Sequence, residues 1–177
     1  MKGSENPYAL HSELAEAMIS NVLIVRENDK LQSTLDVIED IESRWKDIEC
    51  VDTQDWSNPV PSFVNQLWNM IQLSKIITMG ALKRDEFRGS HYKPEFDLNQ
   101  PDDFDPADYL EYEEQKANGG VHKDQFAPSH VDYMKRFEKN NEDWLKSSIA
   151  TYNNGKPAVD FESVDTSLIA PRPRKYD

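Results

Sequence analysis

Three amphipathic stretches in the first 87 residues limit the folds open to this chain. In each stretch apolar side chains recur at spacings of three and four residues, the period that places them on one face of an α-helix. Polar loops separate the stretches, and proline disfavours helix in the residue before it. We expect three helices. The first begins near residue 6 and ends near residue 21 or continues through residues 22–25, and the others cover about residues 28–49 and 62–87. Their inner faces would be made by Leu10, Leu14 and Met18, by Leu31, Leu35, Ile38, Ile41, Trp45 and Ile48, and by Val64, Leu67, Met70 or Ile71, Ser74, Ile77 and Ala81.

The second half of the chain has a different pattern. Residues 95–114 contain nine acidic residues and no basic one, and we expect an exposed insertion with a short helix near residues 107–115. Ser129 is a candidate cap for a further helix to about residue 139. Asn153-Asn154-Gly155 between two short runs predicts a β-hairpin, and an extended basic tail follows.

These patterns predict a mainly α fold with three parts. Residues 1–94 would form a three- to four-helix bundle with up-down helices, as in spectrin. Residues 95–128 would be the acidic insertion. Residues 129–177 would be a small C-terminal α+β subdomain with a helix, the β-hairpin and the basic tail.

Composition and motifs exclude several classes of function. The net charge of −13 disfavours binding to nucleic acid, because an acidic surface repels phosphates. A single cysteine and scattered histidines give neither a disulfide framework nor a metal motif, and the six glycines form no G-x-G-x-x-G pattern. The longest apolar run has four residues, Val22-Leu23-Ile24-Val25, far below the roughly 20 that span a bilayer. We therefore expect a soluble, intracellular chain that reaches a membrane only through a partner.

The segment Arg84–Pro94 concentrates charge where the third helix is expected to end. Arg84, Glu86, Arg88 and His91 lie within eight residues and flank Gly89. One interpretation is local: cations complement the helix dipole at the C-terminus and glycine takes a left-handed cap. The other is that Gly89 turns the chain so that Arg88 and His91 project to one side, while Glu86 stays on the helix and pairs with Arg84. That geometry would dock the helix end onto another domain.

The pattern Arg84-x-Glu86-x-Arg88-Gly89-x-His91-Tyr92 resembles the R-x-E-S-R-G-x-H(-Y) signature of succinate dehydrogenase and fumarate reductase flavoproteins, which L-aspartate oxidase shares. The resemblance covers essentially the whole chain, and the tail is similar to that of bacterial succinate dehydrogenases. Its other parts are Asn6-Pro7 through Met18, Val25-Arg26 before Asn28 and Leu31, Leu67-Trp68-Asn69-Met70, Asn141 through Lys146, Val164 through Ile169, and Pro171 through Tyr176.

Two features depart from the family pattern. Phe87 occupies the place of the signature serine, so a hydrogen bond from that hydroxyl is lost and the packing of the turn must differ. A long acidic insertion, about residues 97–138, separates two motifs that lie closer together in many members.

The resemblance implies a C-terminal helical domain, as a fragment, a split subunit or an expressed piece of a flavoprotein. The family's FAD-binding domain, the histidine that carries covalent FAD and the arginine that moves the substrate proton lie upstream and have no counterpart here. The parent enzyme would oxidise succinate to fumarate through FAD, and this chain alone would be inactive. We therefore assign it no catalytic, cofactor-binding or metal-binding residue.

The same resemblance implies partners and a location. The FAD-binding domain of the same subunit and the iron–sulfur subunit would be direct partners, and a membrane-anchor cytochrome b subunit would be an indirect one. The complex would lie on the inner, cytoplasmic face of the cytoplasmic membrane. The predicted inter-domain contact consists of Arg84, Glu86, Arg88, Gly89, His91 and Tyr92. Two alternatives stay open: a free-standing acidic helical interaction module, and the equivalent domain of L-aspartate oxidase or adenylylsulfate reductase.

Overall fold

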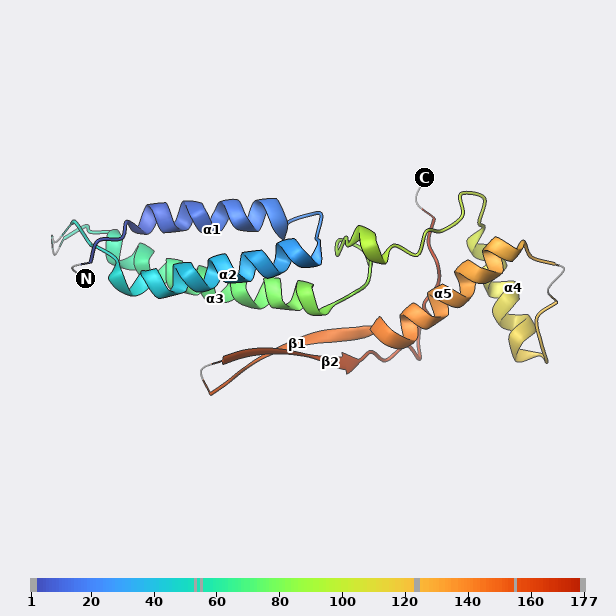
Figure 1. Cartoon of the computed structure of the whole chain (residues 1–177). Coiled ribbons are helices and arrows are strands. Elements are labelled where there is room, and N and C mark those ends of the chain that lie inside the picture. The colour runs from blue at the N-terminus through green and yellow to red at the C-terminus, as the bar shows by residue number, and fades with distance from the viewer. Residues whose placement is uncertain (1–2, 53, 55, 123–124, 155, 176–177) are drawn as a thin grey trace. The chain divides into compact units, whose positions relative to one another are not determined.

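The chain is mainly α-helical and ends in a two-stranded sheet, as predicted (Figure 1). The computed structural model describes residues 3–52, 54, 56–122, 125–154 and 156–175. Its elements are α1 (Pro7–Asn21), α2 (Asn28–Arg44), η1 (Trp45–Asp47), α3 (Val60–Lys83), η2 (Pro94–Phe96), α4 (Pro106–Ala117), α5 (Pro128–Trp144), β1 (Lys146–Asn153) and β2 (Lys156–Ser163).

The elements separate into two compact units. The first unit is Met1–Phe96 with Ser148–Asp160, and the second is Asp97–Ser147 with Phe161–Asp177. The hairpin strands contribute to both units, so each unit contains segments that are distant in sequence. The boundaries at residues 94 and 128 stay a prediction.

The first unit is built on α1, α2 and α3, which pack side by side as a three-helix bundle (Figure 1). The side chain of Asn6 accepts from the N–H groups of Tyr8 and Ala9, which begins α1 as the Asn-Pro pair predicts. The buried core joins residues of all three helices and the segment after α2: Leu10, Leu14, Ile38, Ile41, Ile48, Val64, Leu67 and Ile71.

The predicted stripe of α3 is wrong at one position. Ile77 is exposed, and the adjacent Thr78 is buried in its place. The Thr78 hydroxyl donates to the Ser74 carbonyl at 2.8 Å, which satisfies its hydrogen-bonding group inside the helix. Periodicity alone does not separate two neighbouring positions at the edge of an apolar face.

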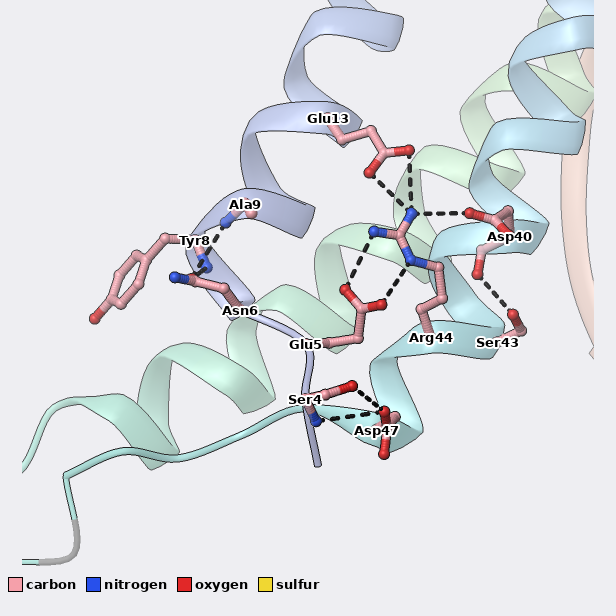
Figure 2. Close-up of polar contacts among 10 residues, drawn as sticks. All are labelled: Ser4, Glu5, Asn6, Tyr8, Ala9, Glu13, Asp40, Ser43, Arg44 and Asp47. Atoms are coloured by element: carbon pink, nitrogen blue, oxygen red, sulfur yellow. Dashed lines mark hydrogen bonds and ion pairs between the residues drawn. The ribbon is translucent and has the colours of Figure 1, made fainter. Parts of the chain in front are cut away.

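A cluster of charges joins α1 and α2 at the end of the bundle where α1 begins (Figure 2). The guanidinium of Arg44 contacts the carboxylates of Glu5, Glu13 and Asp40 at 3.2, 3.0 and 2.9 Å. The hydrogen bonds that Arg44 donates to Glu5 and Asp40 are the largest causes that raise the pKa of Arg44. This cluster holds the segment before α1 against the last turn of α2.

The second unit contains α4 and α5 and an aromatic core. We expected an exposed insertion with a short helix near residues 107–115. The helix is present as the twelve-residue α4, but residues 95–128 also bury four aromatic rings, which we did not expect. Tyr109 and Tyr112 lie one helical turn apart on α4 and meet Tyr133 and Phe137, which lie one turn apart on α5. The full core is Phe104, Tyr109, Tyr112, Phe126, Tyr133, Met134 and Phe137. Aromatic side chains thus give the acidic segment a buried face despite few aliphatic residues.

The helix α5 is longer than predicted, and its cap differs. It begins at Pro128 and ends at Trp144, and Ala127 rather than Ser129 occupies the cap position. Proline is well suited to the first position because it has no N–H to leave unpaired there. The tail, expected to join no core, buries Pro173, and Lys175 Nζ donates to the Asp102 carbonyl at 2.9 Å.

The hairpin forms where the Asn-Asn-Gly sequence predicts a turn. Asn154 has a positive φ of 52°, as such turns require, and Gly155 lies outside the described residues. Within the first unit, Lys83 Nζ donates to the Val159 carbonyl at 2.7 Å. The end of α3 thus donates a hydrogen bond to the backbone of β2.

Candidate functional site

The signature residues lie in the loop of residues 84–92, which follows α3 and is called the signature loop below. The prediction that α3 continues to residue 87 is wrong, because the helix ends at Lys83 and Arg84 is extended. Two side chains further along the chain, His91 and Lys93, bind carbonyl groups at this helix end. Lys93 Nζ donates to the Leu82 carbonyl at 3.1 Å, and His91 contacts the Arg84 carbonyl at 2.8 Å. Carbonyls at the helix end thus gain partners without another helical turn.

Gly89 takes a left-handed conformation, but in a turn rather than as a helix cap. Its φ is +59°, and the residues on either side of the turn, Arg88 and His91, exchange two backbone hydrogen bonds of 3.1 Å. A two-residue turn with glycine in the first central position is the type II′ pattern. The turn reverses the chain directly after Arg88.

Glu86 is the fully buried centre of the charge cluster. Its two carboxylate oxygens accept from Arg84 Nε and Arg88 Nε, each at 2.8 Å. The predicted pairing of Glu86 with Arg84 is present, although Glu86 lies beyond the helix. A buried carboxylate between two guanidinium groups makes charge-assisted bonds, which are stronger than neutral ones.

His91 connects the signature loop to the segment between α1 and α2. Its Nδ1 lies 2.6 Å from Arg26 Nη1, and its Nε2 lies 2.8 Å from the Arg84 carbonyl oxygen. Arginine only donates and a carbonyl only accepts, so these partners assign a neutral ring with the proton on Nε2. Burial is the largest cause that lowers the pKa of His91, and the nearby cations Arg26, Lys93 and Arg84 lower it further against the opposing bond to the Arg84 carbonyl.

Lys93 makes a second connection, to the start of α2. Its buried ammonium group donates to Asn28 Oδ1 at 2.7 Å and to Asp85 Oδ1 at 2.9 Å. Together with the bond to the Leu82 carbonyl, three acceptors surround the three N–H groups of the ammonium. The loop is thereby fixed to both neighbouring helices.

The structure brings the six predicted site residues together and adds others that we did not predict. The missed residues are Arg26, Asn28, Asp85 and Lys93. Tyr92 takes part through its backbone, since its carbonyl accepts from the Arg26 N–H at 2.9 Å, and its ring packs on Phe87 at 4.8 Å. Phe87, where the family has serine, thus adds an aromatic contact to the loop. The sequence signal that could have found the missed residues was the Val25-Arg26…Asn28 pattern.

The cations of the cluster are engaged by acceptors of the chain itself. Arg84 and Arg88 direct Nε at Glu86, and the Lys93 ammonium group is enclosed by its three acceptors. These contacts fix the conformation of the signature loop. Among the described residues, no group of three or more histidine, cysteine or acidic side chains could hold a metal ion.

The rest of the described chain adds two observations. A polar pocket of about 260 Å³ in the second unit is lined by Glu111, Glu114, Gln115, Asn118, Gly120 and His122. No helix among the described residues has the length and apolar character needed to cross a membrane.

Comparison with known proteins places the chain in a family. Residues 11–176 match the family described as the fumarate reductase flavoprotein C-terminus. The chain is 37% identical over 178 residues to the succinate dehydrogenase flavoprotein subunit of Bacillus subtilis, covering 99% of this chain and 24% of that protein. It is 33% identical over 100 residues to one of the subunits of the CoM/CoB fumarate reductase of Methanothermobacter marburgensis, covering 56% of this chain and 18% of that protein.

Solved structures share the fold. A quinol-fumarate reductase solved with menaquinol molecules matches with a TM-score of 0.63 and 18% identity, over 96% of this chain and 23% of that chain. The Sdh1 complex of Mycobacterium smegmatis in the apo form matches with a TM-score of 0.50 and 32% identity, over 52% of this chain and 15% of that chain. The chain thus spans about a quarter, or less, of the length of these relatives. With the R-x-E-x-R-G-x-H loop in place at the end of the bundle, the chain belongs to the family of fumarate reductase flavoprotein C-terminal domains, to which the matching part of the succinate dehydrogenase flavoprotein also corresponds.

Proposed function

We propose that this domain serves a flavoprotein subunit that interconverts succinate and fumarate. The family match over residues 11–176 carries the proposal, and the 37% identity to a succinate dehydrogenase flavoprotein favours succinate oxidation over aspartate oxidation. FAD in the parent subunit would exchange a hydride with the dicarboxylate. We propose no chemical step for this chain itself.

The role proposed for this chain is to pack against the FAD-binding domain of the same subunit. Arg84, Glu86, Arg88, Gly89, His91 and Tyr92 are the proposed inter-domain contact. Within this set Glu86 is fully buried, whereas the Arg88 side chain is 35% exposed. Arg88 is therefore the charged member that can touch a neighbouring domain while its Nε stays on Glu86.

The parent subunit would work in a complex. We propose the iron–sulfur subunit as the next partner for electrons, and a membrane-anchor cytochrome b subunit as an indirect partner. The chain would then be peripheral on the cytoplasmic face of the cytoplasmic membrane. No nucleic acid is expected to bind, since the net charge is −13.

A chimeric flavoprotein tests this function. The chain replaces the matching quarter of the Bacillus subtilis subunit, and the purified protein is assayed for bound flavin and for succinate oxidation with an artificial electron acceptor. We expect flavin content and activity within about threefold of those of the unmodified Bacillus subtilis subunit. A threefold change corresponds to a free-energy difference of less than about 1 kcal/mol. A folded chimera that contains no flavin would refute the proposal.

Arg88→Ala in this chimera tests the contact itself. We expect lower flavin content and a lower unfolding temperature, because the substitution leaves Glu86 with one of two charge-assisted bonds and removes the exposed part of the guanidinium. Lys139→Ala is the matched control, since Lys139 is an exposed cation of α5 that pairs only with nearby acids of its own helix in the described contacts. Equal flavin content and thermal stability in Arg88→Ala and Lys139→Ala would show that Arg88 has no docking role.

A further inference from the structure

Exposed apolar side chains gather at the end of the bundle that carries the signature loop. They are Leu23, Ile24 and Val25, which connect α1 to α2, and Phe87, and we call these four residues the apolar rim. Ile24 is 65% exposed and Phe87 is 37% exposed. Contiguous exposed apolar surface on a soluble protein commonly marks an interaction site.

Tyr92 joins the two halves of the apolar rim. Val25 forms a parallel β-bridge with Tyr92, and the Phe87 ring lies 4.8 Å from the Tyr92 ring. The α1–α2 connection and the signature loop therefore form one surface, although more than 60 residues separate them along the chain. The rim is a property of the folded bundle rather than of one segment.

The helices extend this surface along one side of the bundle. The Thr78 hydroxyl contacts Met18 Sδ at 3.6 Å, so the last turns of α1 and α3 lie level with each other. Ile19 follows Met18 and Ile77 precedes Thr78, and both isoleucines are exposed. Gly80, one turn further along α3, has no atom within 4 Å of the position a Cβ would take, so a neighbouring backbone can approach closely there.

The charges beside the rim are directed inward. Glu86 accepts from Arg84 and Arg88, and His91 lies between Arg26 and the Arg84 carbonyl. These groups hold the loop in place, and Leu23, Ile24, Val25 and Phe87 are exposed beside them together with part of the Arg88 side chain. A partner for this surface needs an apolar face that also accommodates the exposed part of the Arg88 guanidinium.

We propose that the apolar rim is the surface on which the flavin-binding part of the same subunit rests, an inference that rests on the proposed function. The chain accounts for only 24% of the Bacillus subtilis relative and 23% of the quinol-fumarate reductase chain that shares its fold. In such relatives most of the polypeptide is therefore available to cover this end. A second copy of this chain is a poorer occupant, because two chains of net charge −13 repel each other.

Hydrogen exchange of the isolated chain and of the chimera tests the location of the contact. We expect backbone amides of residues 22–27 and 86–88 to exchange at least tenfold more slowly in the chimera, because docking would exclude water from them. Amides of residues 49–52, which follow η1, serve as the internal reference and should not change. Equal exchange at the rim in the two proteins would overturn the inference, and so would protection that requires added iron–sulfur subunit.

Substitutions separate this inference from the proposed function. The control is Val51→Ser, a substitution at a site that is 83% exposed. In the isolated chain, Ile24→Ser and Phe87→Ser should have unfolding temperatures within a degree or two of that of Val51→Ser, because surface substitutions are usually nearly neutral. In the chimera we expect the two rim variants to lose at least threefold in flavin content and Val51→Ser to lose none. Full flavin content in both rim variants would overturn the inference and leave the proposed function standing, whereas an unsubstituted chimera without flavin would overturn both. Concentration-dependent dimerisation of the isolated chain that Ile24→Ser abolishes would assign the rim to a second copy and also overturn it.

Discussion

Replacing Glu86 by glutamine should loosen the signature loop while leaving the bundle folded. The side chain keeps its size, so packing changes little. The carboxylate has two oxygens that each accept from an arginine at 2.8 Å, whereas the amide has one oxygen and one NH2 group. One arginine would then face a donor instead of an acceptor.

The expected cost follows from this geometry. A hydrogen bond to a charged group contributes about 1.5–3 kcal/mol, and Glu86→Gln removes one such bond and weakens the other. Breaking a fully buried ion pair costs about 3–5 kcal/mol, but part of the Arg88 side chain remains in water, which lowers that figure. We therefore expect a loss of about 2–3 kcal/mol in the free energy of opening the loop, which corresponds to roughly 30- to 150-fold in the opening equilibrium.

Native-state hydrogen exchange measured by NMR gives a local readout of this loss. The Arg26 and His91 amides report on the loop, because their N–H groups donate to the Tyr92 and Arg88 carbonyls. Glu13→Gln is the control, since Glu13 belongs to an exposed ion pair with Arg44 worth about 0–1 kcal/mol. The reasoning is refuted if Glu86→Gln changes protection of these two amides no more than Glu13→Gln does.

Three further predictions concern the same end of the bundle. Burial lowers the pKa of His91, so the unfolded state binds a proton more readily than the folded state. The stability that His91 contributes above its ordinary pKa of about 6.5 should therefore be lost as the pH falls below that value. The urea midpoints at pH 7.5 and 5.5 should differ more for the unsubstituted chain than for His91→Gln. Gly89→Ala should destabilise the chain by about 1–2 kcal/mol, because alanine is strained at a φ of +59°. Gly80→Ala, inside α3 with open space around the new methyl group, should stabilise it by up to about 1 kcal/mol in the same urea titration; a midpoint shift in the same direction for both glycine variants would contradict this reasoning.

The bundle was predictable because its core follows helical spacing. Leu10 and Leu14, Ile38 and Ile41, and Leu67 and Ile71 each recur at three or four residues, and all are buried. The second unit was harder to predict, because its core is made of aromatic residues scattered through an acidic segment. Burial of Phe104 and Phe126 depends on irregular connections, which periodicity does not detect.

The signature loop was predictable in composition but not in geometry. The pattern identified Arg84, Glu86 and Arg88 as a unit, and the structure confirms that they lie together. The end of α3 was placed four residues too late, since nothing local to Lys83 stops the helix. The cause is Lys93, whose ammonium group donates to the Leu82 carbonyl from eleven residues further along the chain. Helix propensity is judged from neighbouring residues, so it does not detect a contact of this kind.

The clasp formed by Lys93 and His91 has a consequence for the order of folding. Both side chains reach partners 65 residues earlier in the chain, Asn28 and Arg26. Closing so long a segment costs entropy that only a formed bundle can offset, so the loop should become ordered after the three helices have packed. The surface that Lys93 and His91 hold in place would therefore be complete only on a folded bundle.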